Sequence, residues 1–170
     1  LLGELSERTR DRMVSYGEVL SSLIMAAKLQ SIPIDQHWVD SRNLIKTNSH
    51  HGNALVDFGK TNQLIKDYLT KNPCSLYVAP GFIASDQHNH TTTLGRGGSD
   101  YTAAIYAAAV QASVLEIWTD VSGMMTADPR LVANARPIQH ISYQEAMELS
   151  HFGAKIIYPP TIQPVMTAHI

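Results

Sequence analysis

The stretch "TTLGRGGSDYTAA", residues 92–104, places three glycines and one arginine directly before an alanine-rich apolar segment. Residues 99–112 read as a helix with Ser99 at its N-cap and Asp100 in its first turn. The glycine loop therefore leads into a helix N-terminus, where backbone amides and the helix dipole favour a phosphate or a carboxylate. Arg96 would add a planar fork for the oxygens of such a ligand. A plain turn with a solvated arginine fits the same letters, and the pattern is neither the dinucleotide fingerprint nor the P-loop.

Strand-like and helix-like segments alternate along the rest of the chain, which indicates a layered α/β architecture with right-handed crossovers. A capping box, Ser142 with Glu145 three residues later, begins a helix at 142–154, and a last helix is expected after Pro159 and Pro160. The other predicted elements are a short strand at 34–40, a helix at 59–72 ended by Pro73, a buried strand at 75–82 and a strand at 114–121.

The first helical pattern covers residues 9–30. Apolar side chains recur in it at helical spacing, and Gly17 interrupts the pattern, so we expect a helix with a break. These apolar residues are Met13, Leu20, Leu23, Ile24 and Ala27.

Composition narrows the classes of protein. The 170 residues fit one domain or a large piece of one, and 44% hydrophobic content can fill a sizeable core. A net charge of −2 and 16% charged residues leave no basic footprint for nucleic acid or a membrane surface, so small-molecule partners are expected. Cys74 is the only cysteine, which excludes an internal disulfide, and the letters contain no signal-peptide or membrane-spanning run. A cytoplasmic location is the default expectation, and both ends look cut from a longer protein.

Three further motifs carry candidate site residues. In "EIWTDVSGMMTADPR", residues 116–130, Thr119 and Asp120 end a predicted strand, which is where open α/β sheets bind ligands, and Arg130 follows in a loop. "HFGAKIIYPP" carries Lys155 beyond a helix, and "SYGE" carries Glu18. Each motif also fits an ordinary surface turn or a solvated charge.

The histidines do not predict a metal site. His50 with His51, and His88 with His90, form two pairs in turns, and two ligands in a loop do not make a closed zinc site. We expect solvated loop histidines and no metal bound by protein ligands alone.

Taken together, "SYGE", "GRGGSDYTAA", "EIWTDV", "TADPR" and "SYQEAMELSHFGAK" resemble, in this order, the aspartate kinases of the amino-acid kinase family. The resemblance covers nearly the whole chain and looks closest to the kinase part of the bifunctional aspartokinase/homoserine dehydrogenases. It implies a three-layer α/β/α sandwich on a mainly parallel sheet, incomplete at the N-terminus. Residues 1–170 would form the central and C-terminal part of one catalytic domain, without the regulatory and dehydrogenase domains.

The resemblance also implies a reaction. Aspartate kinases transfer the γ-phosphoryl group of ATP, with Mg²⁺, to the β-carboxylate of L-aspartate, which begins the route to lysine, threonine and methionine. Carried over, Arg96 would bind the α-carboxylate of aspartate, and Glu18 its α-ammonium. Asp100 would be the catalytic carboxylate, with Ser99 beside it at the phosphate oxygens. A homo-oligomer is expected for the full-length protein.

The remaining family positions fall on the nucleotide. Thr119, Asp120 and Met125 would line the pocket, Arg130 and Lys155 would face the ATP phosphates, and Ile156 would wall them in. Met125 stands where the family has a tyrosine, so contact with the adenine there would be apolar. The family's first strand, with its Lys-Phe-Gly-Gly motif, is not in these letters, so we expect this chain alone to be inactive. Two alternatives stay open: a sibling kinase for another acidic substrate such as glutamate, or a non-catalytic nucleotide-binding module.

Overall fold

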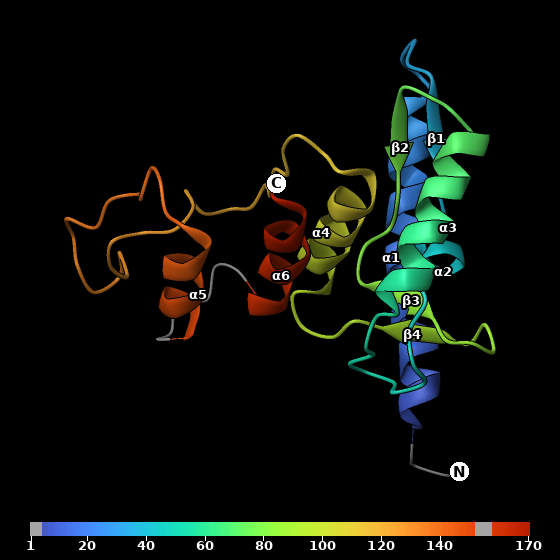
Figure 1. Cartoon of the computed structure of the whole chain (residues 1–170), viewed down its shortest axis with the longest axis horizontal. Coiled ribbons are helices and arrows are strands. Elements are labelled where there is room, and N and C mark those ends of the chain that lie inside the picture. The colour runs from blue at the N-terminus through green and yellow to red at the C-terminus, as the bar shows by residue number, and fades with distance from the viewer. Residues whose placement is uncertain (1–4, 152–157) are drawn as a thin grey trace.

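A computed structural model describes residues 5–151 and 158–170 of the chain (Figure 1). The helices are α1 (Glu7–Leu29), α2 (Ser41–Leu44), α3 (Phe58–Lys71), α4 (Gly98–Val110), α5 (Tyr143–His151) and α6 (Pro159–Ala168). The strands are β1 (Gln36–Trp38), β2 (Leu76–Val78), β3 (Ile83–Ser85) and β4 (Thr91–Thr93).

Two small sheets connect these elements. Strands β1 and β2 pair in parallel, with Gln36 opposite Leu76, and the chain between them passes through α2 and α3. Strands β3 and β4 form an antiparallel hairpin, with Ile83 opposite Thr93. The α/β class is confirmed. The described residues do not contain the single, mainly parallel sheet of the expected three-layer sandwich, because each sheet has two strands and one sheet is antiparallel.

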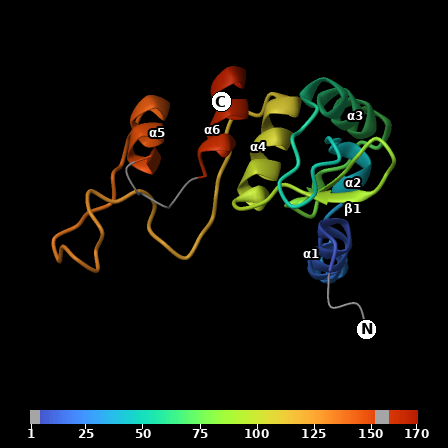
Figure 2. The same ribbon diagram turned by 90° about the horizontal axis from the view of Figure 1, so that it is seen from below.

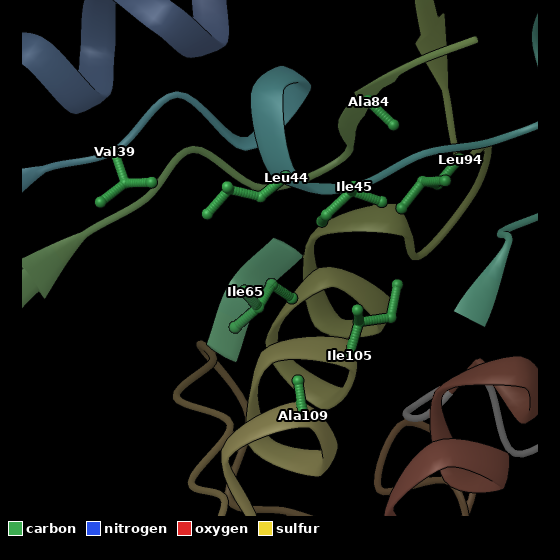
Figure 3. Packing of buried hydrophobic residues seen from close by; sticks show 8 residues of the cluster. All are labelled: Val39, Leu44, Ile45, Ile65, Ala84, Leu94, Ile105 and Ala109. Atoms are coloured by element: carbon green, nitrogen blue, oxygen red, sulfur yellow. The ribbon is translucent and has the colours of Figure 1, made fainter. Parts of the chain in front are cut away.

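The main core lies where α3 and α4 pack beneath the chain that runs from β1 into α2. Figure 3 shows Ile65 of α3 and Ile105 of α4 pointing toward Ile45, and all three side chains are fully buried. Helix α4 carries alanines beside Ile105, and these small side chains let its backbone approach its neighbours closely. The cluster consists of Val39, Leu44, Ile45, Ile65, Ala84, Leu94, Ile105 and Ala109.

Helix α1 is continuous through Gly17, so the predicted break is wrong. A glycine costs a helix interior about 1 kcal/mol relative to alanine, which a helix of 23 residues tolerates. The helix buries Ser15, Ser22 and Ala26 and leaves its large apolar side chains in solvent. Small residues face the sheets because they allow close packing. The exposed apolar residues include Met13, Leu20, Leu23 and Ile24.

The other predicted helices are present with small changes at their ends. Helix α4 begins one residue early and Gly97 is its N-cap, so the prediction of Ser99 as N-cap is wrong, while Asp100 does lie in the first turn. The capping box at α5 is confirmed, since the Ser142 amide donates to Glu145 Oε2 at 2.9 Å and the Glu145 amide donates to Ser142 Oγ at 3.2 Å. Residues 152–154 of that predicted helix lie outside the described residues.

The predicted strand at 114–121 is wrong. This segment belongs to a long connection from α4 to α5 that contains no helix or strand and extends beyond α5 in both views (Figures 1 and 2). Trp118 in it is 89% exposed. No helix within 5–151 or 158–170 has the length and apolar character needed to cross a membrane.

Candidate functional site

Helix α1 contacts a tight turn that follows β2. The carboxylate of Glu18 lies on the half-buried side of the helix, and its Oε1 accepts a hydrogen bond from the Gly81 amide at 3.1 Å. Ser41 of α2 fixes the turn, because its hydroxyl donates to the Pro80 carbonyl at 2.5 Å. Glu18 therefore lies against fixed backbone.

The same turn contacts the first turn of α4. A methyl group added at Gly81 would lie 2.9 Å from the Ser99 Cα, so the two segments touch through bare backbone. Phe82 has a φ of 66°, an uncommon conformation for a residue with a side chain. The Phe82 amide donates to Thr102 Oγ1 at 2.9 Å, and this bond joins the strained residue to α4. Glu18 and Ser99 thus flank Gly81.

Arg96 lies in the loop between β4 and α4. The Leu94 amide donates to the Phe82 carbonyl at 2.9 Å, which places this loop beside the turn at Gly81. Gly97 adopts a φ of 66°, and a methyl group there would meet the side chain of Tyr158 at 2.4 Å. Arg96 is exposed and makes no ion pair with any residue in the described part of the chain.

The N-terminus of α4 carries no side-chain cap. The Gly98 amide donates to the Gly95 carbonyl at 3.1 Å, which closes the loop, and half-buried Asp100 lies in the first turn. An uncapped helix N-terminus beside an arginine attracts anionic oxygens. Arg96, Ser99 and Asp100 thus lie at one end of α4, and Glu18 adjoins this end through its hydrogen bond to Gly81.

Four of the residues predicted to bind the nucleotide, Thr119, Asp120, Met125 and Arg130, lie on the connection between α4 and α5. Thr119 and Asp120 are exposed and hydrogen-bond to each other at 3.1 Å. Arg130 pairs with Asp128 at 2.7 Å, and this hydrogen-bonded guanidinium lowers the pKa of Asp128 to about 2. Met125 is half-buried and forms an isolated antiparallel β-bridge with Pro137. Within residues 5–151 and 158–170 the hydrogen bonds of Thr119, Asp120 and Arg130 are local, and none reaches the start of α4.

Two predicted site residues, Lys155 and Ile156, lie outside the described residues. In the rest of the chain no group of three or more histidine, cysteine, aspartate or glutamate side chains gathers as metal ligands would. The expectation of solvated histidines is wrong for His51, because its Nδ1 lies 2.9 Å from the buried carboxylate of Asp11.

Sequence reasoning missed the supports of this site. Gly81 and Phe82 form the turn that contacts Glu18. Thr102 accepts a hydrogen bond from the Phe82 amide in this turn, and Asp11 accepts one from Thr93, just before the loop that carries Arg96. Asp11 precedes Glu18 by seven residues, or two helical turns, so the two side chains share a helix face. That spacing in "DRMVSYGE" is the signal that could have found Asp11.

Comparison with protein families gives a match to "Amino acid kinase family" over residues 3–170. The chain belongs to the amino acid kinase family. Among curated members, lysine-sensitive aspartokinase 3 of Escherichia coli is 41% identical over 94% of this chain. A chloroplastic bifunctional aspartokinase/homoserine dehydrogenase 2 of Arabidopsis thaliana is 39% identical over 100% of it. The chain spans 36% of the first protein and 19% of the second.

Comparison with solved structures gives related matches. E. coli aspartokinase III in complex with aspartate and ADP matches with a TM-score of 0.91 at 40% identity, over 98% of this chain and 37% of that one. An isopentenyl phosphate kinase matches with a TM-score of 0.53 at 18% identity, which shows a shared fold alone. The fold of the described residues is thus that of aspartokinases, despite the small size of its sheets.

Proposed function

We propose that this chain is part of an aspartate kinase, which transfers the γ-phosphoryl group of ATP to the β-carboxylate of L-aspartate and forms 4-phospho-L-aspartate. The observation that carries the proposal is the arrangement around α4, where Glu18 and Arg96 flank one uncapped helix N-terminus. An α-amino acid presents an ammonium and a carboxylate on one carbon. A carboxylate and a guanidinium at one small site match that pair of charges.

The roles of the side chains follow from this orientation. Glu18 would bind the α-ammonium, and Arg96 would bind the α-carboxylate by two parallel hydrogen bonds. The side-chain carboxylate of the substrate would then face the first turn of α4, where Ser99 would donate to phosphate oxygens. Asp100 would orient the groups that exchange the phosphoryl group. Phosphoryl transfer needs in-line positioning and electrostatic stabilisation rather than a covalent enzyme intermediate.

The residues that follow α4 in the chain would bind the nucleotide. Arg130 and Lys155 would face the polyphosphate, with Thr119, Asp120, Met125 and Ile156 around the nucleoside. E. coli aspartokinase III has been solved with ADP and aspartate, which supports this pair of ligands. Mg²⁺ is commonly held by one or two carboxylates together with substrate phosphates, and Asp100 is a carboxylate of the kind it uses. When bound, the metal would neutralise charge on the phosphates.

Replacement of Arg96 tests the proposal. In the full-length protein, Arg96→Ala should raise the Michaelis constant for aspartate by about one to two orders of magnitude, because a charge-assisted bidentate contact is lost. The constant for ATP should change little. Arg8→Ala is the matched control, since Arg8 is an exposed arginine of α1. An unchanged constant for aspartate in Arg96→Ala would contradict the assignment.

A panel of acceptors tests the substrate. Phosphorylation of L-aspartate, measured by ADP release with Mg²⁺, should exceed that of L-glutamate, because the added methylene would displace the acceptor carboxylate from the start of α4. Preference for L-glutamate would assign a sibling kinase. Nucleotide binding without any phosphoryl transfer would assign a binding module.

A further inference from the structure

Asp11 of α1 is a buried carboxylate to which the proposed function assigns no role. Its side chain is 2% exposed, although aspartate is among the residues least often buried. A buried carboxylate is costly unless donors surround it. Its contacts therefore show what the protein gains from it.

Four hydrogen bonds from two other segments satisfy Asp11. The Thr93 hydroxyl of β4 donates to Oδ1 at 2.6 Å. The Gly52 amide donates to both carboxylate oxygens at 3.1 and 3.0 Å, and His51 Nδ1 lies 2.9 Å from Oδ2. Asp11 thus ties α1 to β4 and to the loop around Gly52.

Both of these segments border the loop between β4 and α4 that carries Arg96. Thr93 precedes Arg96 by three residues. On the other side, a methyl group added at Gly95 would lie 2.8 Å from Asn53 Oδ1 and 3.2 Å from the Gly52 carbonyl, so the Gly52 loop packs against Gly95. The Ala54 amide donates to the Thr93 carbonyl at 2.9 Å and joins the two segments to each other.

The same helix carries Glu18 two turns later. Seven residues of α-helix span about 10 Å, so α1 is a rigid spacer between Asp11 and Glu18. Glu18 contacts the turn at Gly81, and Asp11 holds the segments that flank Gly95. We propose that Asp11 is a positioning residue that fixes the distance between Glu18 and Arg96, and so sets the fit of the amino-acid substrate. This inference rests on the proposed function.

Kinetics of the full-length protein separate positioning from general stability. Asp11→Ala should raise the Michaelis constant for aspartate by about 10- to 100-fold, since a displacement of about 1 Å costs a site about this much, and should change that for ATP by less than about twofold. Asp11→Asn keeps the size and one acceptor oxygen for Thr93 and Gly52, and should lose less of the affinity than Asp11→Ala. Thr61→Val is the control: Thr61 is fully buried, accepts from the Lys46 amide at 3.0 Å, and lies in α3.

Hydrogen exchange provides a readout that does not depend on activity. In the 170-residue chain, Asp11→Ala should speed exchange of the amides at 95–98 and at Gly81 more than elsewhere, and Thr61→Val should not. If Asp11→Ala fails to fold, Thr93→Val removes one of the four bonds and should move both readouts in the same direction by a smaller amount.

The outcomes are distinct. A selective rise in the constant for aspartate, together with faster exchange at 95–98, supports the inference. Equal rises for aspartate and ATP, or the same exchange pattern in Asp11→Ala and Thr61→Val, would overturn it. If the wild-type protein phosphorylates no amino acid, the proposed function fails, and the exchange data alone decide whether Asp11 orders the loop.

Discussion

Residues 5–111 and residues 112–151 contain similar proportions of the β-branched and aromatic residues that favour strands, yet they fold differently. In the first region, β1 finds β2 as a parallel partner, and the segments around both strands share a core with α3 and α4. In the second region, Leu115 packs against α4 and α6, but the segment at 114–121 forms no strand pairing in the described part of the chain and leaves Trp118 in solvent. A strand-like sequence pattern shows that a segment could pair, but a strand forms only where a partner strand lies beside it.

The second region has its own small cluster. Met124 packs with Ala146 of α5 and Ile162 of α6. Three buried side chains stabilise far less than the eight of the main core, because hydrophobic stabilisation scales with the area removed from water. We therefore expect substitutions in the second region to cost less than matched substitutions in the first.

The largest contrast should come from apolar truncations. Ile105→Ala removes a fully buried side chain of the main core and should lower the free energy of unfolding by about 2 to 5 kcal/mol. Trp118→Ala removes a larger side chain that is 89% exposed and should change it by less than about 0.5 kcal/mol. Urea unfolding followed by circular dichroism measures both. A comparable loss for Trp118→Ala would show that the 114–121 segment is packed in solution.

Two carboxylates, Asp86 in the first region and Asp128 in the second, allow the regions to be compared by their response to pH. Burial alone would raise the pKa of Asp86, but bonds from the His90 amide, the Ser49 hydroxyl and the His88 amide lower it to about 2. Asp128 also has a pKa of about 2, caused by Arg130. The Asp86 side chain is 1% exposed and that of Asp128 is 34% exposed, so water screens only the second.

The pH dependence of stability should differ accordingly. The folded-state pKa of Asp86 lies below its ordinary 3.8, so its contribution, about 2 kcal/mol, is present above pH 4 to 5 and is lost as the pH falls toward 2. Asp86→Asn should remove that dependence, whereas Asp128→Asn should leave it intact. Unfolding in urea between pH 2 and pH 7 checks this. Equal curves for Asp86→Asn and the wild type would contradict the assignment.

The smallest contrast concerns helix caps. The Asp57 side chain accepts from the Lys60 amide at 3.0 Å and caps α3, and Ser142 caps α5. Replacing either by alanine removes a cap worth about 1 kcal/mol. In Asp57→Ala this loss should appear in the midpoint of global unfolding, since α3 is part of the main core. In Ser142→Ala we expect faster amide exchange within α5 and little change in the midpoint. A shift of the midpoint in both variants would show one cooperative unit.

Much of the first region follows from local rules. Helix α3 begins at Phe58 after its cap and ends before Pro73, as the letters predict, because caps and prolines act on neighbouring residues. Arg96 beside the N-terminus of α4 was also predictable, since glycines before an apolar helix mark a loop that admits a ligand. The assignment of aspartate as the substrate rests on the family resemblance.

Other features depended on tertiary contacts. Whether 114–121 forms a strand depends on a partner distant in sequence, and no local pattern supplies one. Which face of α1 is buried depended on how closely its small residues could approach the sheets, so Ser15 and Ser22 are buried while Leu20 and Ile24 are exposed. The sequence by itself determined where the helices lie along the chain and the glycine–arginine loop, because these result from bonds within a few residues. The bond from Gly81 to Glu18 and the buried site of Asp11 were decided only by tertiary structure, because their partners lie 40 to 82 residues away along the chain.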